Sequence, residues 1–150
     1  MDSMILNAAT VLERKGSKLY KVQLGEILFD CVVLMNKKRI GSLVVLDDNG
    51  RLAGVISERD IMRLVESKDR ELWRKPVKNV MTPREKLFFV QKDTPLDAVM
   101  GLMTEKRIRH VPIMDGENLM GVISIGDVVK NLFDEAAFTT EQLKHYIQGY

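Results

Sequence analysis

A short segment recurs in the two halves of this 150-residue chain, and this repeat limits the folds that the chain can adopt. Residues 54–60 read Gly-Val-Ile-Ser-Glu-Arg-Asp, and residues 121–127 read Gly-Val-Ile-Ser-Ile-Gly-Asp. The halves align at an offset of 68 residues, which becomes 67 after a turn that is one residue longer in the first half. A length change confined to a turn is typical of a structural repeat. We therefore expect two pseudo-symmetric halves.

Each half has the pattern strand, helix, strand, strand, helix. Apolar runs predict three strands per half, over 19–22, 43–46 and 52–56 and again over 87–90, 111–114 and 119–123. Apolar positions at helical spacing predict the helices, over 27–35, 61–65, 96–103 and 128–133. We expect Thr94 to cap the third of these helices. Pro112 has no amide hydrogen, so its strand should lie at an edge or expose that position.

Three domains are predicted from the repeat and its flanks. The first spans 1–72 and the second 73–138, with a charged linker that ends at Pro76, and an amphipathic C-terminal helix follows over 139–150. Thr139 and Gln142 fit a capping box at the start of that helix. Its apolar stripe either folds back on the body or meets a second subunit, and we favour the second subunit.

The composition is that of a soluble globular protein, with 45% hydrophobic and 29% charged residues. No apolar run approaches the roughly 18 residues of a membrane-spanning helix, and no signal peptide is evident. A net charge of +2 is too small to indicate a nucleic-acid partner. The single cysteine, Cys31, excludes an intrachain disulfide and is expected in the core. We therefore expect a cytoplasmic protein with no membrane or nucleic-acid partner.

In both copies of the repeat, a serine is followed three residues later by an aspartate, as Ser57 with Asp60 and as Ser124 with Asp127. One interpretation is helix capping alone. The other is that the hydroxyl and the carboxylate hold a sugar phosphate, because the free amides at a helix N-terminus favour an anion. The two roles are compatible, and the spacing alone leaves both open.

These segments, together with 39–45, 77–83 and 107–113, resemble the cystathionine-β-synthase (CBS) domain pair, or Bateman module, over about 11–133. The resemblance implies a layered α+β fold in which two βαββα halves pack through their sheets, here with an added C-terminal helix. It also implies two clefts that bind adenosine-containing ligands, in which the aspartate accepts hydrogen bonds from the ribose hydroxyls. The expected regulatory ligand is an adenine nucleotide, AMP first, with ADP, ATP, NADH and S-adenosylmethionine as alternatives.

The resemblance assigns ligand-binding residues to each cleft. The first cleft would be formed by Ser57, Arg59, Asp60, Val80, Met81, Thr82, Ile108, Arg109 and His110. The second would be formed by Ser124, Gly126, Asp127, Leu12, Ile40, Gly41 and Ser42. We expect stronger binding at the Asp60 cleft, because a guanidinium such as that of Arg109 can bind phosphate oxygens bidentately. The alternative for Arg109 and His110 is two solvated side chains at a strand end.

The leading functional hypothesis is a non-catalytic sensor that binds an adenine nucleotide and relays its occupancy to an unidentified partner protein. The alternative is a ligand-independent dimerisation scaffold. An enzyme has little support, because the chain has two His and one Cys, with no Gly-rich phosphate loop and no metal-ligand cluster. We therefore predict no catalytic and no metal-binding residues. The resemblance further implies a homodimer in which two modules form a flat disc.

Overall fold

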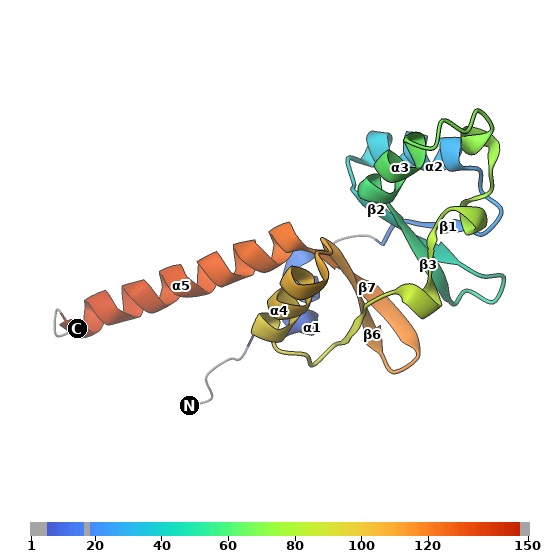
Figure 1. Ribbon diagram of the computed structural model, residues 1–150. Helices are drawn as coiled ribbons and strands as arrows, with labels where there is room; N and C mark the ends of the chain where they lie inside the picture. Colours follow the sequence, from blue (N-terminus) through green and yellow to red (C-terminus); the bar gives the residue numbers. More distant parts are fainter. Residues whose placement is uncertain (1–5, 17–18, 148–150) are drawn as a thin grey trace. The chain divides into compact units, whose positions relative to one another are not determined.

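The computed structural model describes residues 6–16 and 19–147 of the chain (Figure 1). This part contains five α-helices, seven β-strands and three short 3-10 helices. They form two compact units. Unit 1 joins the segment before residue 18 to the segment from Phe89 onward, and unit 2 consists of Lys18–Phe88. None of the described helices is both long enough and apolar enough to cross a membrane.

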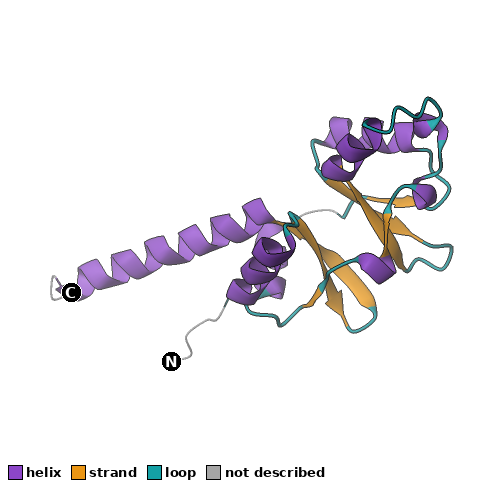
Figure 2. Ribbon diagram, in the orientation of Figure 1, coloured by secondary structure: helices purple, strands orange, loops and turns teal. Residues whose placement is uncertain are grey.

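Unit 2 contains a four-stranded sheet in the order β1-β2-β3-β4. The strands β1 (Lys21–Gln23) and β2 (Ser42–Leu46) are parallel, whereas β3 (Leu52–Ser57) is antiparallel to both β2 and β4 (Thr82–Pro83). The helices α2 (Leu28–Lys38) and α3 (Glu58–Val65) lie together beside this sheet (Figure 2). The three 3-10 helices are η1 (Leu72–Arg74), η2 (Val77–Asn79) and η3 (Arg84–Lys86). The buried core is formed by Leu28, Cys31, Met35, Leu43, Val45, Ile56, Leu72 and Val77.

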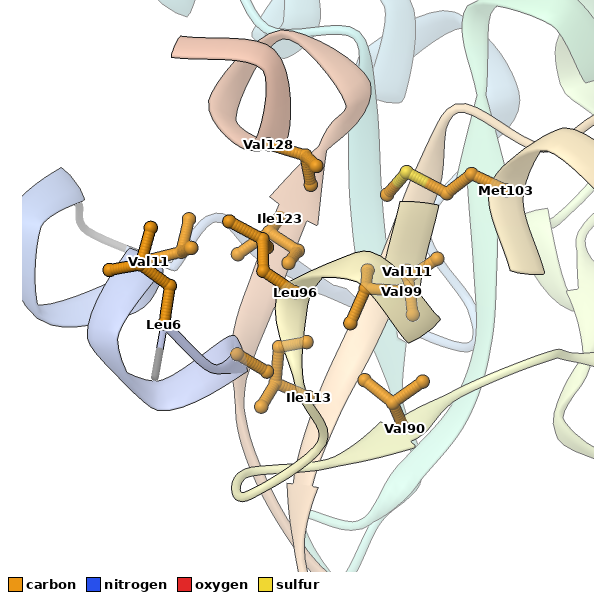
Figure 3. Packing of buried hydrophobic residues seen from close by; sticks show 11 residues of the cluster. Leu6, Val11, Val90, Leu96, Val99, Met103, Val111, Ile113, Ile123 and Val128 are labelled. Carbon is orange, nitrogen blue, oxygen red and sulfur yellow. The ribbon is translucent and has the colours of Figure 1, made fainter. Parts of the chain in front are cut away.

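Unit 1 has the same plan, with a three-stranded sheet in the order β5-β6-β7. Its elements are α1 (Ala8–Lys15), β5 (Val90–Gln91), α4 (Leu96–Lys106), β6 (His110–Asp115), β7 (Asn118–Ser124) and α5 (Ile125–Ile147). Side chains from α1, α4, α5 and the sheet meet in one core (Figure 3). This confirms the βαββα order predicted for each half.

The segment that precedes each repeat copy packs in the unit of the other copy. In unit 1 the amide of Leu96 donates to the carbonyl of Leu6 at 2.9 Å. In unit 2 the amide of Leu28, the counterpart of Leu96, donates to the carbonyl of Lys75, also at 2.9 Å. The backbone of each lead-in segment therefore satisfies the first free amide of a helix. Each predicted domain contains one copy of the repeat, as the copies follow each other along the sequence. Each compact unit instead combines one copy with the segment that precedes the other copy.

Two local predictions for the second half are wrong. Thr94 does not cap α4, which begins at Leu96 after Pro95 with no side-chain cap, because the lead-in carbonyl of Leu6 takes that place. Pro112 is buried in β6, the middle strand of its sheet. In unit 2 the amide of Val44, the counterpart of Pro112, donates to the carbonyl of Tyr20, next to β1. In unit 1 the strand β5 takes the place of β1, and its pairing with β6 begins only at Ile113, one residue after Pro112. The missing donor of Pro112 therefore costs no ladder hydrogen bond.

The predicted C-terminal helix is present, but it begins before residue 139 and continues the last helix of the second half. The helix α5 runs without a break over Ile125–Ile147 and extends past α1 and α4 (Figure 1). The predicted capping box at Thr139 lies in its middle, where the hydroxyl of Thr140 donates to the carbonyl of Ala136 at 2.9 Å. The last three residues of the predicted helix, 148–150, lie outside the described residues.

Candidate functional site

The serine and aspartate of each copy form a reciprocal cap at the start of a helix. In unit 2 the Ser57 amide donates to Asp60 Oδ2 at 3.0 Å, and the Asp60 amide donates to Ser57 Oγ at 3.2 Å. In unit 1 the Ser124 amide donates to Asp127 Oδ2 at 2.8 Å, and the Asp127 amide donates to Ser124 Oγ at 3.1 Å. The capping interpretation is thus confirmed in both copies.

The chain reaches each cap directly from a strand. Ser57 ends β3 in an extended conformation, and α3 begins at the next residue, so the first helical turn starts directly at the C-terminal end of the strand. The first amides of a helix have no partner within it, and the helix dipole favours an anion at this end. The cap fills one of the two acceptor positions of Oδ2 in each carboxylate, so it leaves Oδ1 and the second position of Oδ2 as acceptors for a ligand. Both caps can therefore combine a structural role with ligand binding.

Strand-end residues lie beside the cap of their own unit. The carbonyl of Gly41 accepts from the amide of Glu58 at 2.9 Å, and Ser42 lies opposite Ser57 in the sheet. In unit 1 the carbonyl of Arg109 accepts from the amide of Ile125 at 2.8 Å, and His110 lies opposite Ser124. The two units therefore build the same frame around the two caps.

The lead-in residues pack against a glycine of each repeat. A Cβ on Gly54 would lie 2.6 Å from Met81 Sδ and 2.5 Å from the carbonyl oxygen of Thr82. A Cβ on Gly121, the counterpart of Gly54, would lie 2.8 Å from Leu12 Cδ2. Leu12 and Met81 thus occupy equivalent places in the two units, and each glycine permits the close approach of its lead-in segment.

The residues expected at the two clefts are distributed over both units. Unit 2 holds Asp60 with Ser57, Arg59, Val80, Met81 and Thr82, as expected for the first cleft. Unit 1 holds Asp127 with Ser124, Gly126 and Leu12, as expected for the second cleft. The other members expected at each cleft belong to the other unit, and their contribution stays a prediction: they are Ile108, Arg109 and His110 for the first cleft, and Ile40, Gly41 and Ser42 for the second.

Lys15 is a site residue that the sequence did not reveal. Its Nζ lies 2.8 Å from Asp127 Oδ2 and donates to the carbonyl of Val122 at 3.2 Å. The side chains of Lys15 and Asp127 are 30% and 23% exposed. Partial burial raises the pKa of the Asp127 carboxyl, but the hydrogen bonds from Lys15 and Ser124 and the charge of Lys15 outweigh it, so this pKa lies below its usual value. One feature of the sequence could have indicated this contact: Lys15 lies one helical turn after Leu12, and the resemblance places Leu12 at this cleft.

The carboxylate of Asp60 has a different environment. Among the described residues of unit 2, Asp60 forms its cap with Ser57 and no ion pair. The two acids of the repeat therefore have the same cap but differ in whether a cation pairs with them. Asp127 is half of an ion pair, whereas Asp60 has no such pair within its own unit.

Unit 2 also contains an open cleft of about 450 Å³ between α2 and α3. Of the predicted site residues, only Ile40 lines it, next to Met35, Arg39, Glu58 and Ile61. Neither Ser57 nor Asp60 lines it, so this cleft is not the predicted ligand site. Among the described residues, no group of His, Cys, Asp and Glu side chains could hold a metal ion.

Comparisons with known proteins agree with this geometry. The family model of the CBS domain matches residues 16–67 and 77–134. The mitochondrial CBS domain-containing protein CBSX3 of Arabidopsis thaliana is 36% identical over 126 residues, which are 83% of this chain and 61% of that protein. The chain thus spans less than two thirds of CBSX3. Because that relative is mitochondrial by name, the cytoplasmic location stays a prediction.

Solved structures match over most of the chain. A CBS-domain containing protein from Agrobacterium tumefaciens superposes with a TM-score of 0.78 at 31% identity, covering 84% of this chain and 98% of that one. The structure of CBSX2 in complex with AMP superposes with a TM-score of 0.68 at 28% identity, covering 79% of this chain and 90% of that one. These matches bear out the fold described for both units.

Proposed function

Because this chain belongs to the CBS domain family and carries two copies of the domain, we propose that it is a regulatory module that binds an adenine nucleotide. The observation that carries the proposal is the duplicated cap, in which Asp60 and Asp127 each present a carboxylate at the N-terminus of a helix. The related protein CBSX2, solved in complex with AMP, supports AMP as the first ligand to test. ADP, ATP, NADH and S-adenosylmethionine are the further candidates.

Ligand binding follows from the chemistry of the cap. A ribose hydroxyl donates to the carboxylate oxygen that the cap leaves open, and a hydrogen bond to a charged acceptor contributes about 1.5–3 kcal/mol. The dipole of α3 or α5 favours the phosphate near the N-terminus of the helix. For the Asp60 site, the proposal includes the expected contributions of Ile108, Arg109 and His110.

We propose a non-catalytic role for the module. The single cysteine, Cys31, is fully buried. Burial is the main cause that raises the pKa of its thiol to about 11, and the negative charges of Glu26 and Asp30 raise it further. A thiol with this pKa is protonated near neutral pH and is a poor nucleophile. The proposal is that the signal passes to another protein, and this requires that the ligand bind two shapes of the module with different affinity.

A homodimer is part of the proposal, and it also defines the competing function. The helix α5 exposes large apolar side chains, including Phe133 and Ile147. An exposed apolar helix face is suited to pairing with a second copy. If the module binds no adenine compound, a dimerisation scaffold built on this face is the function that remains.

Calorimetric titration of AMP and NADH separates the two functions. Asp60→Asn keeps an acceptor for the Ser57 amide but removes the charge that a ribose hydroxyl would meet, so it should weaken AMP binding about tenfold or more. Asp134→Asn, on the exposed part of α5, removes the same charge elsewhere and should bind AMP as the unaltered protein does. Equal affinities for Asp60→Asn and the unaltered protein would count against the assignment of Asp60.

A thermal unfolding series provides a second measurement. A ligand present at 100 times its Kd stabilises the folded protein by about 2.7 kcal/mol, which is visible as a rise in Tm. AMP, ADP, ATP, NADH and S-adenosylmethionine are compared at equal concentration. A Tm that none of these compounds changes would favour the scaffold.

A further inference from the structure

We propose that Lys15 restricts access to the Asp127 carboxylate, so that the second acid of the repeat binds adenosine ligands more weakly than its chemistry allows. This inference rests on the proposed function, because it concerns how one of the two proposed sites is tuned. Lys15 acts as a competitor from within the chain, since its ammonium takes a place on the carboxylate that a ligand hydroxyl would use.

The position of Lys15 is fixed by the helix that carries it. Helix α1 begins at a cap in which Asn7 Oδ1 accepts from the amide of Thr10 at 2.9 Å, and Val11 is buried in the core of unit 1. At its other end, Arg14 donates to Asn131 Oδ1 at 3.1 Å. Asn131 is only 5% exposed and donates in turn to the carbonyl of Asp127 at 2.8 Å. Lys15, the last residue of α1, is therefore presented to Asp127 by an anchored element.

The carboxylate of Asp127 is already well supplied with donors. Oδ2 receives the amide of Ser124 at 2.8 Å and the ammonium of Lys15 at 2.8 Å. The two neighbouring hydroxyls of a ribose bind a carboxylate best when both of its oxygens accept. The Ser124 amide and the Lys15 ammonium together fill both acceptor positions of Oδ2, so only Oδ1 is open, and a ribose loses one of the two charge-assisted hydrogen bonds or must displace the ammonium.

The other copy of the repeat shows why only one site is restricted. The lead-in of unit 2 forms the strand β4, and Thr82 pairs through its backbone with Val55. Val122 is the counterpart of Val55, and its carbonyl is the group that accepts from Lys15 Nζ. A helix in place of a strand therefore brings an ammonium to Asp127, whereas within the described residues Asp60 has no ion pair.

The test isolates the Asp127 site by placing every variant in an Asp60→Asn background. Adenosine and AMP are titrated by calorimetry into this protein and into the same protein with Lys15→Met, which removes the ammonium but keeps the length of the side chain. Lys92→Met is the matched control, because Lys92 forms an exposed ion pair with Asp115 at 3.3 Å in the same unit. Lys15→Arg keeps the cation. Circular dichroism and thermal melts verify that each variant is folded.

Lys15→Met should tighten adenosine binding about tenfold, the gain expected from one recovered charge-assisted hydrogen bond. Lys92→Met and Lys15→Arg should bind adenosine as the background does. Unchanged or weaker adenosine binding by Lys15→Met would overturn the inference. Weaker binding of AMP alone would show instead that Lys15 is a phosphate ligand, which also overturns it.

The same titrations distinguish this failure from that of the proposed function. If the unaltered protein binds AMP and Lys15→Met changes nothing, only the role of Lys15 is rejected. If neither the unaltered protein nor any variant binds adenosine or AMP, the nucleotide-binding function itself is rejected, and the inference about Lys15 fails with it.

Discussion

At the scale of single residues, Lys15 and Asp127 give the stability of the protein a pH dependence. The pKa of Asp127 lies below its usual value of 3.8, because hydrogen bonds from Lys15 and Ser124 and the charge of Lys15 outweigh the effect of partial burial. A carboxyl group with a depressed folded pKa stabilises the protein above its unfolded pKa. That stabilisation is lost as the pH falls through the folded value.

We therefore expect Lys15→Met to lower the free energy of unfolding at neutral pH by about 0.5 kcal/mol, a typical value for a partly exposed ion pair. The difference from the unaltered protein should be constant above about pH 5 and should shrink as the pH falls through 3.8 and below, where Asp127 becomes protonated in both the unfolded and the folded state. Urea unfolding at a series of pH values measures this difference. A difference that persists at the lowest pH would show that Lys15 stabilises by packing rather than by charge.

The two caps could be predicted from the sequence, whereas the contact made by Lys15 could not. The spacing of Ser57 and Asp60, repeated at Ser124 and Asp127, was sufficient to predict both caps, because capping depends on residues three positions apart. Lys15 was not predictable in this way. Its partner is far away in sequence and comes close only because the lead-in helix packs in the unit of the other repeat copy.

At the scale of elements, the two glycines of the repeat should respond differently to the same substitution. A Cβ on Gly54 would lie 2.5 Å from a backbone oxygen, that of Thr82, whereas a Cβ on Gly121 would meet the end of the Leu12 side chain at 2.8 Å. A strand backbone cannot move without breaking its pairing, but a leucine side chain can rotate away. We expect Gly54→Ala to destabilise the protein by about 1–3 kcal/mol, as overpacking does, and Gly121→Ala by less.

Urea unfolding of the two variants, under identical conditions, measures the difference. Gly101→Ala is the control, because a Cβ at this helical position meets nothing within 4 Å. An alanine inside an exposed part of a helix should be neutral or stabilising. Equal costs for Gly54→Ala and Gly121→Ala would mean that the lead-in strand yields as easily as a leucine side chain.

Most elements could be predicted from hydrophobic periodicity, and two of the exceptions share a cause. The apolar runs of both halves became strands, and Cys31 is in the core as expected. Thr94 failed as a cap because a carbonyl from the lead-in segment, Leu6, takes its place. Pro112 is tolerated in a middle strand because the neighbouring strand is short on that side. In both cases a segment distant in sequence decided the outcome, and periodicity carries no information about such partners.

At the scale of the whole molecule, the exchange of lead-in segments determines which pieces of the chain can fold alone. Unit 2 is continuous in sequence, over Lys18–Phe88, and its core includes Leu72 and Val77. A fragment limited to residues 1–72 follows the sequence repeat but lacks Val77 and the strand β4. It would also carry α1 without β7 and α5, against which α1 packs.

We expect the fragment 18–88 to unfold cooperatively in urea, and the fragment 1–72 to show weak structure and no cooperative transition. Deleting the buried Val77 alone should cost about 1.5–3 kcal/mol of apolar burial, a large part of the stability of so small a unit. Circular dichroism at a series of urea concentrations measures both fragments. A cooperative transition in 1–72 alone would show that the sequential halves, rather than the compact units, are the folding domains.

The helix α5 carries exposed apolar side chains that could pair two copies of the protein. Phe133 is 72% exposed, Leu143 57% and Ile147 81%. At the spacing of an α-helix, these side chains share one stripe with Val129, whereas Phe138 lies on the opposite side. In an antiparallel pair of α5 helices, Val129 would lie opposite Ile147 of the second copy and Phe133 opposite Leu143. The small residues Ala136 and Thr140 would meet between them, where close approach is needed.

A pairing of this kind is self-complementary, as a two-fold interface must be, because every contact occurs twice. We therefore expect the protein to be a dimer in light scattering coupled to size-exclusion chromatography, and Phe133→Ser with Leu143→Ser to make it monomeric. Phe138→Ser removes an equally large apolar side chain from the other face and should leave the dimer intact, since Phe138 is itself 65% exposed. A double variant that remains dimeric would place the interface on another surface. A monomeric unaltered protein would show that this stripe serves a different partner.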